Sequence, residues 1–382
     1  MTAAASYDVI VVGLGGMGSA TVRTLADRGV RVLGLERFTS GHDHGSSHGR
    51  SRIIRQAYFE DPAYVPLVLR SYDLWRQLEA DSGEPLLTIT GGLMIGRPDS
   101  ELVQGARRSA ELHGLDHEMM DSAELHRRHP LLRPASDEVA LFEPHAGFVD
   151  PEAAVLAHNR AAQAAGADLH FDEPITSWGA DGGGTWVRTT KARYEAGHLV
   201  LAAGAWMPQL LAGLDIELTV TRQVLCWFDP PDGVDPFRPE RFPIYIWELD
   251  AERTFYGFPH QVGPPGGVKV AFFHRDEPAD PDHLDRVVPP GDVATLLGVL
   301  QEKVPASAGP LLDAIVCMYT LTRDHHFLID VHPAYANVTL ASPCSGHGFK
   351  FTPVIGEILA DLALDGKTAH PIELFRLDRL RT

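Results

Sequence analysis

The chain has 382 residues, 44% of them hydrophobic and 22% charged, and its formal net charge is −18. This length allows two domains around a large buried core, and the negative charge argues against a nucleic-acid or anionic-membrane partner. The first residues lack the basic start of a signal peptide, and no apolar run reaches the roughly 18 residues that a membrane helix needs. We therefore expect a cytoplasmic protein.

A strand–helix–strand unit opens the chain. Residues 7–12 are a run of β-branched and aliphatic residues typical of a buried strand, residues 19–28 have a helical pattern, and residues 30–35 are a second apolar strand. Three glycines with the spacing G-x-G-x-x-G stand between the first strand and the helix: Gly13, Gly15 and Gly18. This arrangement favours a dinucleotide-binding unit over an ordinary glycine turn.

Each part of this unit has a physical role. Gly13 allows a tight turn, Gly15 lets the backbone approach a pyrophosphate, and Gly18 lets the helix pack closely on the strand. The helix N-terminus presents unpaired N–H groups to the phosphates. Glu36, directly after the second strand, can accept hydrogen bonds from a ribose diol. We therefore predict a cofactor with an unphosphorylated ribose, such as FAD or NAD.

A polar loop rich in glycine and histidine follows at residues 38–51. His42, His44 and His48 lie in it, but acids or cysteines at metal-ligand spacing are missing. The three cysteines of the chain are also too few and too scattered for a disulfide framework or a zinc site. We predict no metal, and we expect this loop to fold over the cofactor.

Two kinds of sequence alternate along the rest of the chain. Residues 86–96 have strand character and start a second region, and a helix begins with Asp150 as its N-cap. The apolar strand at 196–203 ends in a small-residue turn at Gly204, which can bring a backbone close to a nucleotide. Between residues 216 and 314, alternating strands joined by Pro- and Gly-rich loops predict an antiparallel sheet.

The predicted fold class is α/β plus α+β. A discontinuous Rossmann-type nucleotide-binding domain is expected from residues 1–85, 147–215 and 318–382. A second domain for the substrate and the catalytic groups, built on a mostly antiparallel sheet, is expected from residues 86–146 and 216–317.

Three strings carry a resemblance to a known family: GSSHGRSRIIRQAY at 45–58, CMYTLTRDHHFLID at 317–330 and SGHGFKF at 345–351. Together with the LVLAAGAW turn, they resemble the monomeric sarcosine oxidase and N-methyltryptophan oxidase family. These are flavin amine oxidases with FAD linked covalently to a cysteine. The resemblance extends from the first strand to the C-terminal helix, so it implies that the predicted nucleotide-binding domain is an FAD-binding domain.

The resemblance implies a set of cofactor-binding residues. Cys317 corresponds to the flavin-attachment cysteine, whose thiolate adds to the 8-methyl position of the ring. Besides the glycine motif and Glu36, the cofactor-binding positions are Ser46, His48, Gly204, Gly346, Gly348 and Lys350. Cys226 and Cys344 are expected to be inert.

Four cations stand in apolar or glycine-rich sequence, where an unpaired charge is costly. By resemblance, Arg55 and Lys350 clamp the substrate carboxylate, for which a planar guanidinium suits bidentate pairing. Arg52 is expected against the flavin ring. Lys269 resembles the lysine that activates oxygen, since a fixed cation stabilises the negative charge of reduced oxygen.

The wall of the substrate pocket shows both agreement with the family and departures from it. Tyr256 resembles a family tyrosine that lines the pocket. The family commonly has a pocket histidine four residues after the oxygen-site lysine, whereas here Phe273 stands there and His274 follows. A one-residue step turns a strand side chain to the other face unless a bulge resets the register. Trp247 is expected to border the pocket and to reshape the substrate cavity.

The implied function is an FAD-dependent oxidase of secondary-amine amino acids. A hydride equivalent leaves the carbon next to nitrogen for the flavin, the imine hydrolyses, and O₂ takes the electrons to give H₂O₂. N-methyl substrates then release formaldehyde. Three alternatives stay open: a cyclic imino-acid oxidase of the same family (pipecolate, proline or piperideine carboxylate), a dehydrogenase with another electron acceptor, and a non-catalytic flavoprotein. The expected partners are a small amino acid and O₂, and the resemblance implies a monomer.

Overall fold

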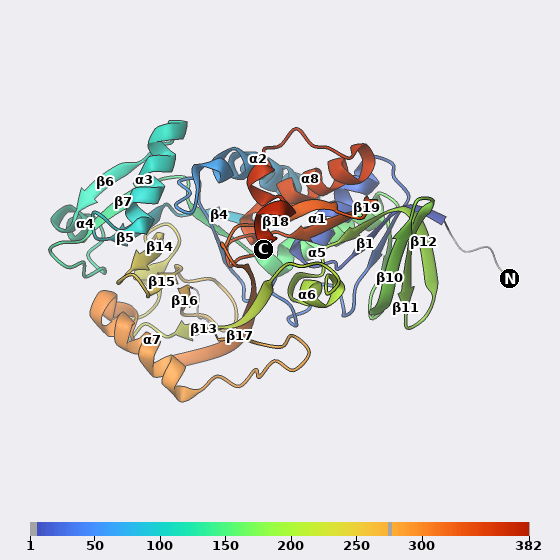
Figure 1. Ribbon diagram of the computed structural model, residues 1–382. Helices are drawn as coiled ribbons and strands as arrows, with labels where there is room; N and C mark the ends of the chain where they lie inside the picture. Colours follow the sequence, from blue (N-terminus) through green and yellow to red (C-terminus); the bar gives the residue numbers. More distant parts are fainter. Residues whose placement is uncertain (1–5, 274–276, 382) are drawn as a thin grey trace.

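The computed structural model of the chain describes residues 6–273 and 277–381. Two large sheets stand side by side, one at each end of an elongated molecule, and a small third sheet lies between them (Figure 1). The α-helices are α1 (Gly16–Asp27), α2 (Val65–Ser82), α3 (Glu101–His113), α4 (Ser122–Arg128), α5 (Pro151–Ala164), α6 (Met207–Leu210), α7 (Pro290–Lys303) and α8 (Thr352–Asp365).

The first large sheet has a parallel centre in the order β19-β12-β1-β2-β9, as a dinucleotide-binding fold requires. Antiparallel strands border it: β18 pairs with β19, and the β10–β11 hairpin pairs with β12. Its strands are β1 (Ser6–Val12), β2 (Val32–Leu35), β9 (Asp168–His170), β10 (Ile175–Asp181), β11 (Gly184–Thr189), β12 (Arg193–Leu201), β18 (Leu328–His332) and β19 (Tyr335–Ser342).

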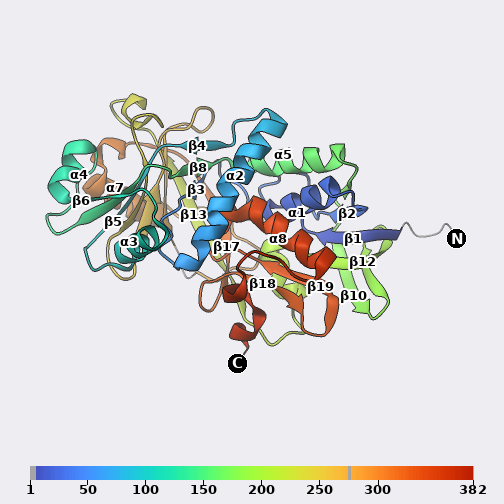
Figure 2. The ribbon, with the colours of Figure 1, turned by 90° about the horizontal axis from the view of Figure 1, so that it is seen from above.

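Both faces of this sheet are covered. Val9 and Val11 pack into the core under α1, α5 and α8, which lie next to one another in Figure 2 with α2 against α8 and α5. Ile10 and Val12 point the other way, into a core that includes Met207 of α6. Burial on both faces explains why β1 is apolar along its whole length rather than alternating.

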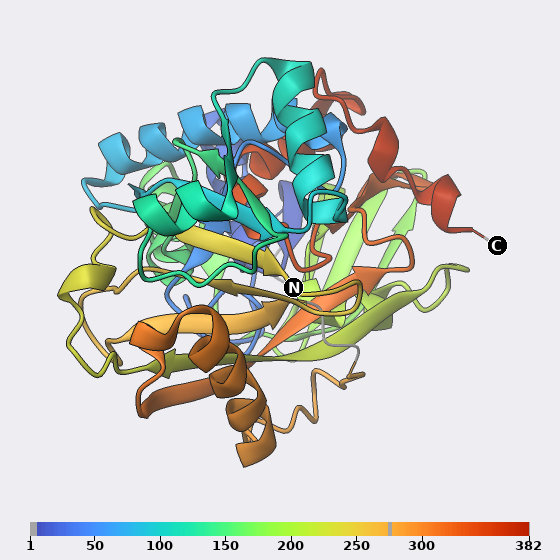
Figure 3. The ribbon, with the colours of Figure 1, turned by 90° about the vertical axis from the view of Figure 1, so that its left-hand side faces the viewer.

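The second large sheet has the order β17-β13-β16-β15-β14-β5-β7-β6, and all its pairs are antiparallel except β14 with β5. The helices α7 and α3 cover opposite faces of it (Figure 3). Its strands are β5 (Gly92–Gly96), β6 (Glu118–Asp121), β7 (Val139–Glu143), β13 (Leu218–Phe228), β14 (Ile244–Glu248), β15 (Thr254–Gly257), β16 (Val268–Phe273) and β17 (Leu311–Thr322).

The small sheet, β3 (Arg52–Ile54), β8 (Gly147–Val149) and β4 (Leu87–Ile89), is antiparallel and carries Arg52 between the large sheets. Short 3₁₀ turns complete the fold at Pro62–Tyr64, Gly204–Trp206, Asp235–Phe237, Pro305–Ser307, Phe349–Phe351, Glu373–Phe375 and Leu377–Leu380. The mixed α/β fold class predicted from the sequence is confirmed. The domain boundaries stay a prediction, and the one proposed at 317/318 falls inside the continuous strand β17.

None of the described helices is long and apolar enough to cross a membrane. Among the same residues, no group of three or more histidine, cysteine or acidic side chains is placed to hold a metal ion.

Candidate active site

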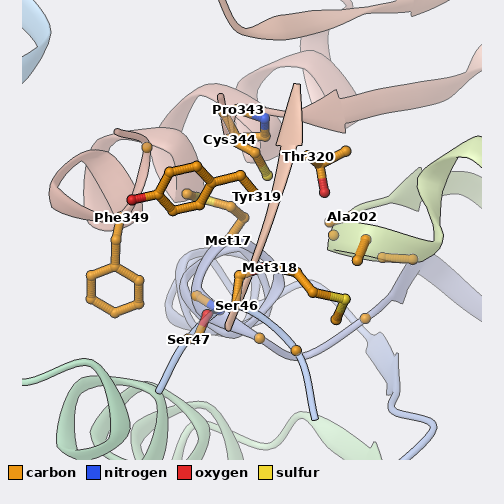
Figure 4. A pocket seen from close by; sticks show the side chains of 18 of the residues that line it. Met17, Ser46, Ser47, Ala202, Met318, Tyr319, Thr320, Pro343, Cys344 and Phe349 are labelled. Atoms are coloured by element: carbon orange, nitrogen blue, oxygen red, sulfur yellow. Dashed lines mark hydrogen bonds between the residues drawn. The ribbon is translucent and has the colours of Figure 1, made fainter. Parts of the chain in front are cut away.

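A cavity of about 390 Å³ lies between the two large sheets, within the size range of small-molecule sites. Side chains of β17, of the loop at Ser46 and Ser47 and of the segment at Pro343 and Cys344 meet around it (Figure 4). The predicted site residues that line it are Gly13, Gly15, Glu36, Ser46, Arg52, Arg55, Gly204, Tyr256, Gly346, Gly348 and Lys350. Gly18, His48, Lys269 and Cys317 are buried and do not line it.

The glycine motif shapes one end of the cavity. Gly13 has a φ of +89°, and a Cβ there would lie 2.6 Å from the Ala202 carbonyl oxygen. A Cβ at Gly18 would lie 1.7 Å from the Gly13 carbonyl oxygen, so this glycine is required for the packing of α1 on β1. A Cβ at Gly15, in contrast, would meet only Ser47 Oγ at 3.6 Å and would otherwise point into the cavity. Gly15 therefore leaves room for a ligand rather than for protein.

Glu36 is fixed at the same end of the cavity. Its carboxylate accepts hydrogen bonds from Leu14 N at 2.8 Å and from Phe38 N at 3.0 Å. His42 Nε2 lies 3.3 Å from Glu36 Oε1. These contacts hold a buried carboxylate at the rim, next to the turn that Gly13 starts.

Cys317 lies among groups that activate a thiol. Its Sγ is 3.5 Å from Arg52 Nη2 and 3.8 Å from the Ser46 carbonyl oxygen. Although burial raises its pKa, His48 and Arg52 lower it, and the result is a pKa of about 6. This lowered pKa favours the thiolate of Cys317. Cys344, in contrast, lines the cavity with a pKa that burial raises to about 11.

Arg55 and Lys350 come together at the other end of the cavity, in a buried polar cluster. Arg55 Nη2 donates to both oxygens of Glu60, at 2.7 and 2.6 Å. Lys350 Nζ donates to the His347 carbonyl oxygen at 2.7 Å and to the Tyr58 hydroxyl at 3.4 Å. Burial, and after it Arg55, lowers the pKa of Lys350 well below its usual range. Although burial raises the pKa of Glu60, Arg55, His347 and Lys350 hold it at about 2.

Lys269 is a third buried basic side chain, and burial, with Arg52 after it, lowers its pKa well below the usual range. Its Nζ donates to the carbonyl oxygens of Gly49 at 2.7 Å and Ser51 at 2.8 Å. Its other side faces the rings of Phe258 and Trp227, whose centroids lie 4.8 and 5.6 Å away. Phe258 lines the cavity, whereas Lys269 does not.

The comparisons with known proteins agree with this geometry. The sequence profile of the family described as FAD dependent oxidoreductase matches residues 8–362. The monomeric sarcosine oxidase of Streptomyces avermitilis is 53% identical, over 98% of both chains. The chain belongs to this family of FAD-dependent oxidoreductases. The N-methyl-L-tryptophan oxidase of Salmonella arizonae is 34% identical, over 98% of this chain and 99% of its own. Among solved structures, NikD, an amino acid oxidase of nikkomycin biosynthesis, matches with a TM-score of 0.85 and 27% identity, over 97% of both chains.

The residues of this oxidoreductase fit FAD. The open face of Gly15 and the carboxylate of Glu36 suit a pyrophosphate and a ribose, the roles that are expected of them from the sequence and that stay a prediction. Gly204 and Gly346 have φ values of +54° and +80° and bring backbone to the cavity. A Cβ at Gly348 would lie 1.8 Å from the Pro343 carbonyl oxygen, so this turn before α8 also requires glycine.

Aromatic side chains form the wall near Arg52. Phe273 lines the cavity, and its ring lies 6.3 Å from Phe59, 6.5 Å from Tyr256 and 6.2 Å from Tyr319. The position of the family's pocket histidine thus carries an apolar ring in this oxidoreductase. His274, which the sequence left open, lies outside the described residues.

The prediction that Trp247 borders the pocket is wrong. Its side chain is fully buried on the face of β14 that packs toward α7, and its Nε1 donates to Glu138 Oε1 at 3.1 Å. The neighbouring Ile246 lines the cavity instead. Successive side chains of a strand point to opposite faces, and residues 244–247 are buried on both, so the hydrophobic pattern did not indicate which residue faces the site.

Sequence reasoning also missed a contact at the nucleotide end. Asp282, in the segment after β16, accepts hydrogen bonds from Arg37 Nη1 at 2.6 Å, Trp206 Nε1 at 2.9 Å and Gln209 Nε2 at 2.9 Å. All three donors line the cavity. A single exposed aspartate in a polar loop carries no signal in the sequence, because only the tertiary structure brings it to that place.

Proposed function

We propose that this FAD-dependent oxidoreductase oxidises small secondary-amine amino acids, with N-methyl amino acids as the first candidates. The observation that carries the proposal is the buried pair of cations, Arg55 and Lys350, at the aromatic end of the FAD cavity. Arg55 is paired with Glu60, and burial lowers the pKa of Lys350, so an incoming carboxylate would favour the ammonium form of Lys350 and be attracted by it. The named activities of the curated relatives, sarcosine oxidase and N-methyl-L-tryptophan oxidase, support the same substrate class.

The substrate is held by its carboxylate, with its amine toward Tyr256 and Phe273. The apolar rings around that position exclude water and favour the neutral amine, which gives up a hydride more readily than the ammonium form. When bound, FAD supplies the acceptor for two electrons and passes them to O₂, which leaves as H₂O₂. The oxidised substrate is an imine, and water hydrolyses it to formaldehyde and the free amino acid.

Three further residues support this chemistry. We propose that Cys317, whose thiolate Arg52 and His48 stabilise, is the covalent attachment point of FAD. Lys269 supplies a fixed positive charge for the reduction of O₂. The acceptor is therefore expected to be O₂ rather than another electron carrier. Following the names of its relatives, we propose a monomer, and we propose that it acts in the cytoplasm.

A second substrate class is favoured by Phe273. This ring, with Phe59 and Ile246, gives the cavity an apolar wall, where the family commonly has a histidine. Such a wall suits the methylene groups of a cyclic imino acid such as pipecolate or proline.

A product assay separates the two classes. Purified enzyme is incubated with sarcosine, N-methyltryptophan, pipecolate and proline, and H₂O₂ and formaldehyde are measured together, with glycine as a primary-amine control. The proposal predicts equal amounts of both products from an N-methyl substrate. Peroxide without formaldehyde, from cyclic substrates alone, would replace N-methyl oxidation with imino-acid oxidation. No peroxide from the whole panel would contradict both.

A further inference from the structure

A three-residue turn, Gly49–Arg50–Ser51, lies between a buried cation and a carboxylate. On one side, Lys269 Nζ donates to the carbonyl oxygens of Gly49 and Ser51 and to Ser51 Oγ, at 2.7, 2.8 and 3.2 Å. On the other side, Glu152 Oε1 accepts from Gly49 N at 2.6 Å and both carboxylate oxygens accept from Arg50 N, at 3.2 and 3.1 Å. The N–H groups of Gly49 and Arg50 thus point at a carboxylate, and the carbonyls of Gly49 and Ser51 point at the lysine.

The turn has a backbone that few sequences adopt unaided. Gly49 and Arg50 have φ values of +91° and +67°, and the second is a non-glycine residue in the left-handed region. Side chains hold it there: the Arg50 guanidinium donates to the carbonyl oxygens of Val262 and Pro264, and Gln261 Nε2 donates to the Arg50 carbonyl at 2.9 Å. Glu152, in the first turn of α5, adds the only negative charge that contacts the amide side of this turn among the described residues.

This geometry favours the charged form of Lys269, which burial opposes. An ammonium group has three N–H donors, and the turn supplies three oxygens for them. Within the described part of the chain, Lys269 Nζ forms its hydrogen bonds with two carbonyl oxygens and a hydroxyl oxygen and has no ion pair with a carboxylate, so dipoles favour its charge without neutralising it. A positive charge that no carboxylate neutralises can stabilise negative charge that forms in a reaction nearby.

We propose that Glu152 is a positioning residue for the oxygen reaction: it fixes the Gly49–Ser51 turn, and the turn holds Lys269 in place and charged. This inference rests on the oxygen-site role proposed above for Lys269. Four charged or titratable groups act on Lys269 in the described structure. Burial, and after it the Arg52 cation, lowers the pKa of Lys269 well below its usual range, whereas Glu152, Cys317 and Asp150 raise it and so favour the charged form.

The test replaces Glu152 with glutamine, which keeps the shape of the side chain and removes its charge. Sulfite is added to the resting holoenzyme over a range of pH, because this anion binds flavins more tightly beside a cation. Sulfite affinity is expected to fall as pH rises through the pKa of Lys269. Since the Glu152 anion raises that pKa, the fall in E152Q is expected about one pH unit lower than in the wild type. The pH profile of kcat/KM for O₂ is expected to shift in the same direction.

Glu101→Gln is the matched control, since it also removes an acid from the first turn of a helix, α3, and it is expected to leave both profiles unchanged. If E152Q does not fold with flavin, Glu152→Asp retains the anion on a shorter side chain and is expected to shift the profiles in the same direction by less. A uniform loss at every pH, with unmoved midpoints, would overturn the proposal, because a purely structural role predicts that result.

Two further measurements separate this inference from the proposed function. Lys269→Met is expected to remove the pH-dependent sulfite transition; if the transition persists, Lys269 is not its source and the inference fails. Anaerobic reduction of the flavin by N-methyl amino acids tests the proposed substrate class alone. If no N-methyl amino acid reduces the flavin, the proposed substrate class is wrong, but the sulfite test of Glu152 is unaffected.

Discussion

The two ends of the FAD cavity are built in different ways. The nucleotide end is made of backbone: Gly13 and Gly15 shape it, and Glu36 contributes a carboxylate fixed by two backbone N–H groups. The reacting end is made of buried side-chain charges, Arg55 and Lys350, among aromatic rings. Most of the first end, from Gly13 to Glu36, comes from one continuous stretch of 30 residues, residues 7–36, while the second is assembled from segments far apart in the chain.

The two ends therefore differ in the substitutions that they tolerate. Where glycine lets backbone atoms pack closely, an added Cβ is destabilising, because the backbone atoms that it would meet cannot move aside. A cluster of buried charges is destabilised when one partner is removed, because the remaining groups stay buried without a hydrogen bond or an opposite charge. The predictions below use these two kinds of failure to test the assignment of each end.

The largest effect is expected at Gly18. Gly18→Ala would place a methyl group 1.7 Å from the Gly13 carbonyl oxygen, so we expect a loss of stability of about 3 kcal/mol and little protein with bound FAD. Gly15→Ala, where the Cβ meets only Ser47 Oγ, is expected to fold normally and to bind FAD weakly. Thermal unfolding and flavin content check this pair, with Gly298→Ala on α7 as a control in open space. Equal loss of stability in both variants would contradict the separation of packing from ligand approach.

The next largest effect is expected at Lys269. Lys269→Met removes the cation but keeps most of the volume, so we expect flavin reoxidation by O₂ to slow on the order of 10²–10³-fold. Anaerobic reduction by substrate should change little, because that step does not create negative charge at O₂. Stopped-flow absorbance measures both steps. Unchanged reoxidation would remove Lys269 from the oxygen site and reopen the dehydrogenase alternative.

A smaller effect is expected at Arg55. Arg55→Ala removes one of the two cations at the reacting end, and we expect substrate affinity to fall roughly 30-fold, or about 2 kcal/mol, with FAD content unchanged. Arg70→Ala is the control, since Arg70 forms an exposed ion pair with Glu357. Titration of the flavin spectrum with a carboxylate inhibitor checks the affinity. The clamp assignment would be wrong if inhibitors with and without a carboxylate lost affinity equally.

Ionisation of Cys317 should be visible in the flavin-free protein. The thiolate absorbs in the ultraviolet, and the difference between the wild type and Cys317→Ser is expected to rise with pH through about 6. Because His48 lowers this pKa, His48→Asn is expected to move the midpoint upward by about one unit. A midpoint at the ordinary thiol value in the wild type would show that Cys317 is not activated.

The smallest effect is expected at Asp282, the side-chain contact at the nucleotide end. In a Cys317→Ser background, Asp282→Ala should speed FAD dissociation about threefold, since a partly exposed ion pair and its hydrogen bonds contribute little. Asp285→Ala, in the same segment, is the control, because its carboxylate accepts from Val287 N. No difference between the two variants would mean that the backbone alone retains the nucleotide.

The sequence predicted the nucleotide end well because each requirement there is local. The G-x-G-x-x-G spacing, the position of Glu36 and the cap of α5 by Asp150 all follow from neighbouring residues, and the structure places each accordingly. The helix α1 begins at Gly16, earlier than the pattern indicated, because Gly18, the last glycine of the motif, already belongs to it and Gly15 is its N-cap.

The reacting end could not be derived in the same way. Arg52, Lys269 and Cys317 meet only after three strands from separate parts of the chain are placed, so the resemblance to a family supplied what local patterns could not. Trp247 shows the limit, since a strand buried on both faces does not indicate which residue faces the site. Glu60 was also missed, although it stands only five residues from Arg55, because its pairing depends on the path of the loop.

The most direct test of the whole account is the mass and colour of the acid-denatured, flavin-loaded protein. The account predicts a yellow pellet and a Cys317 peptide heavier by one FAD, because the thiolate beside Arg52 would lie at the flavin end of the cavity. A colourless pellet, with flavin free in solution and an unmodified Cys317 peptide, would contradict covalent attachment and the placement of the flavin ring beside this cysteine.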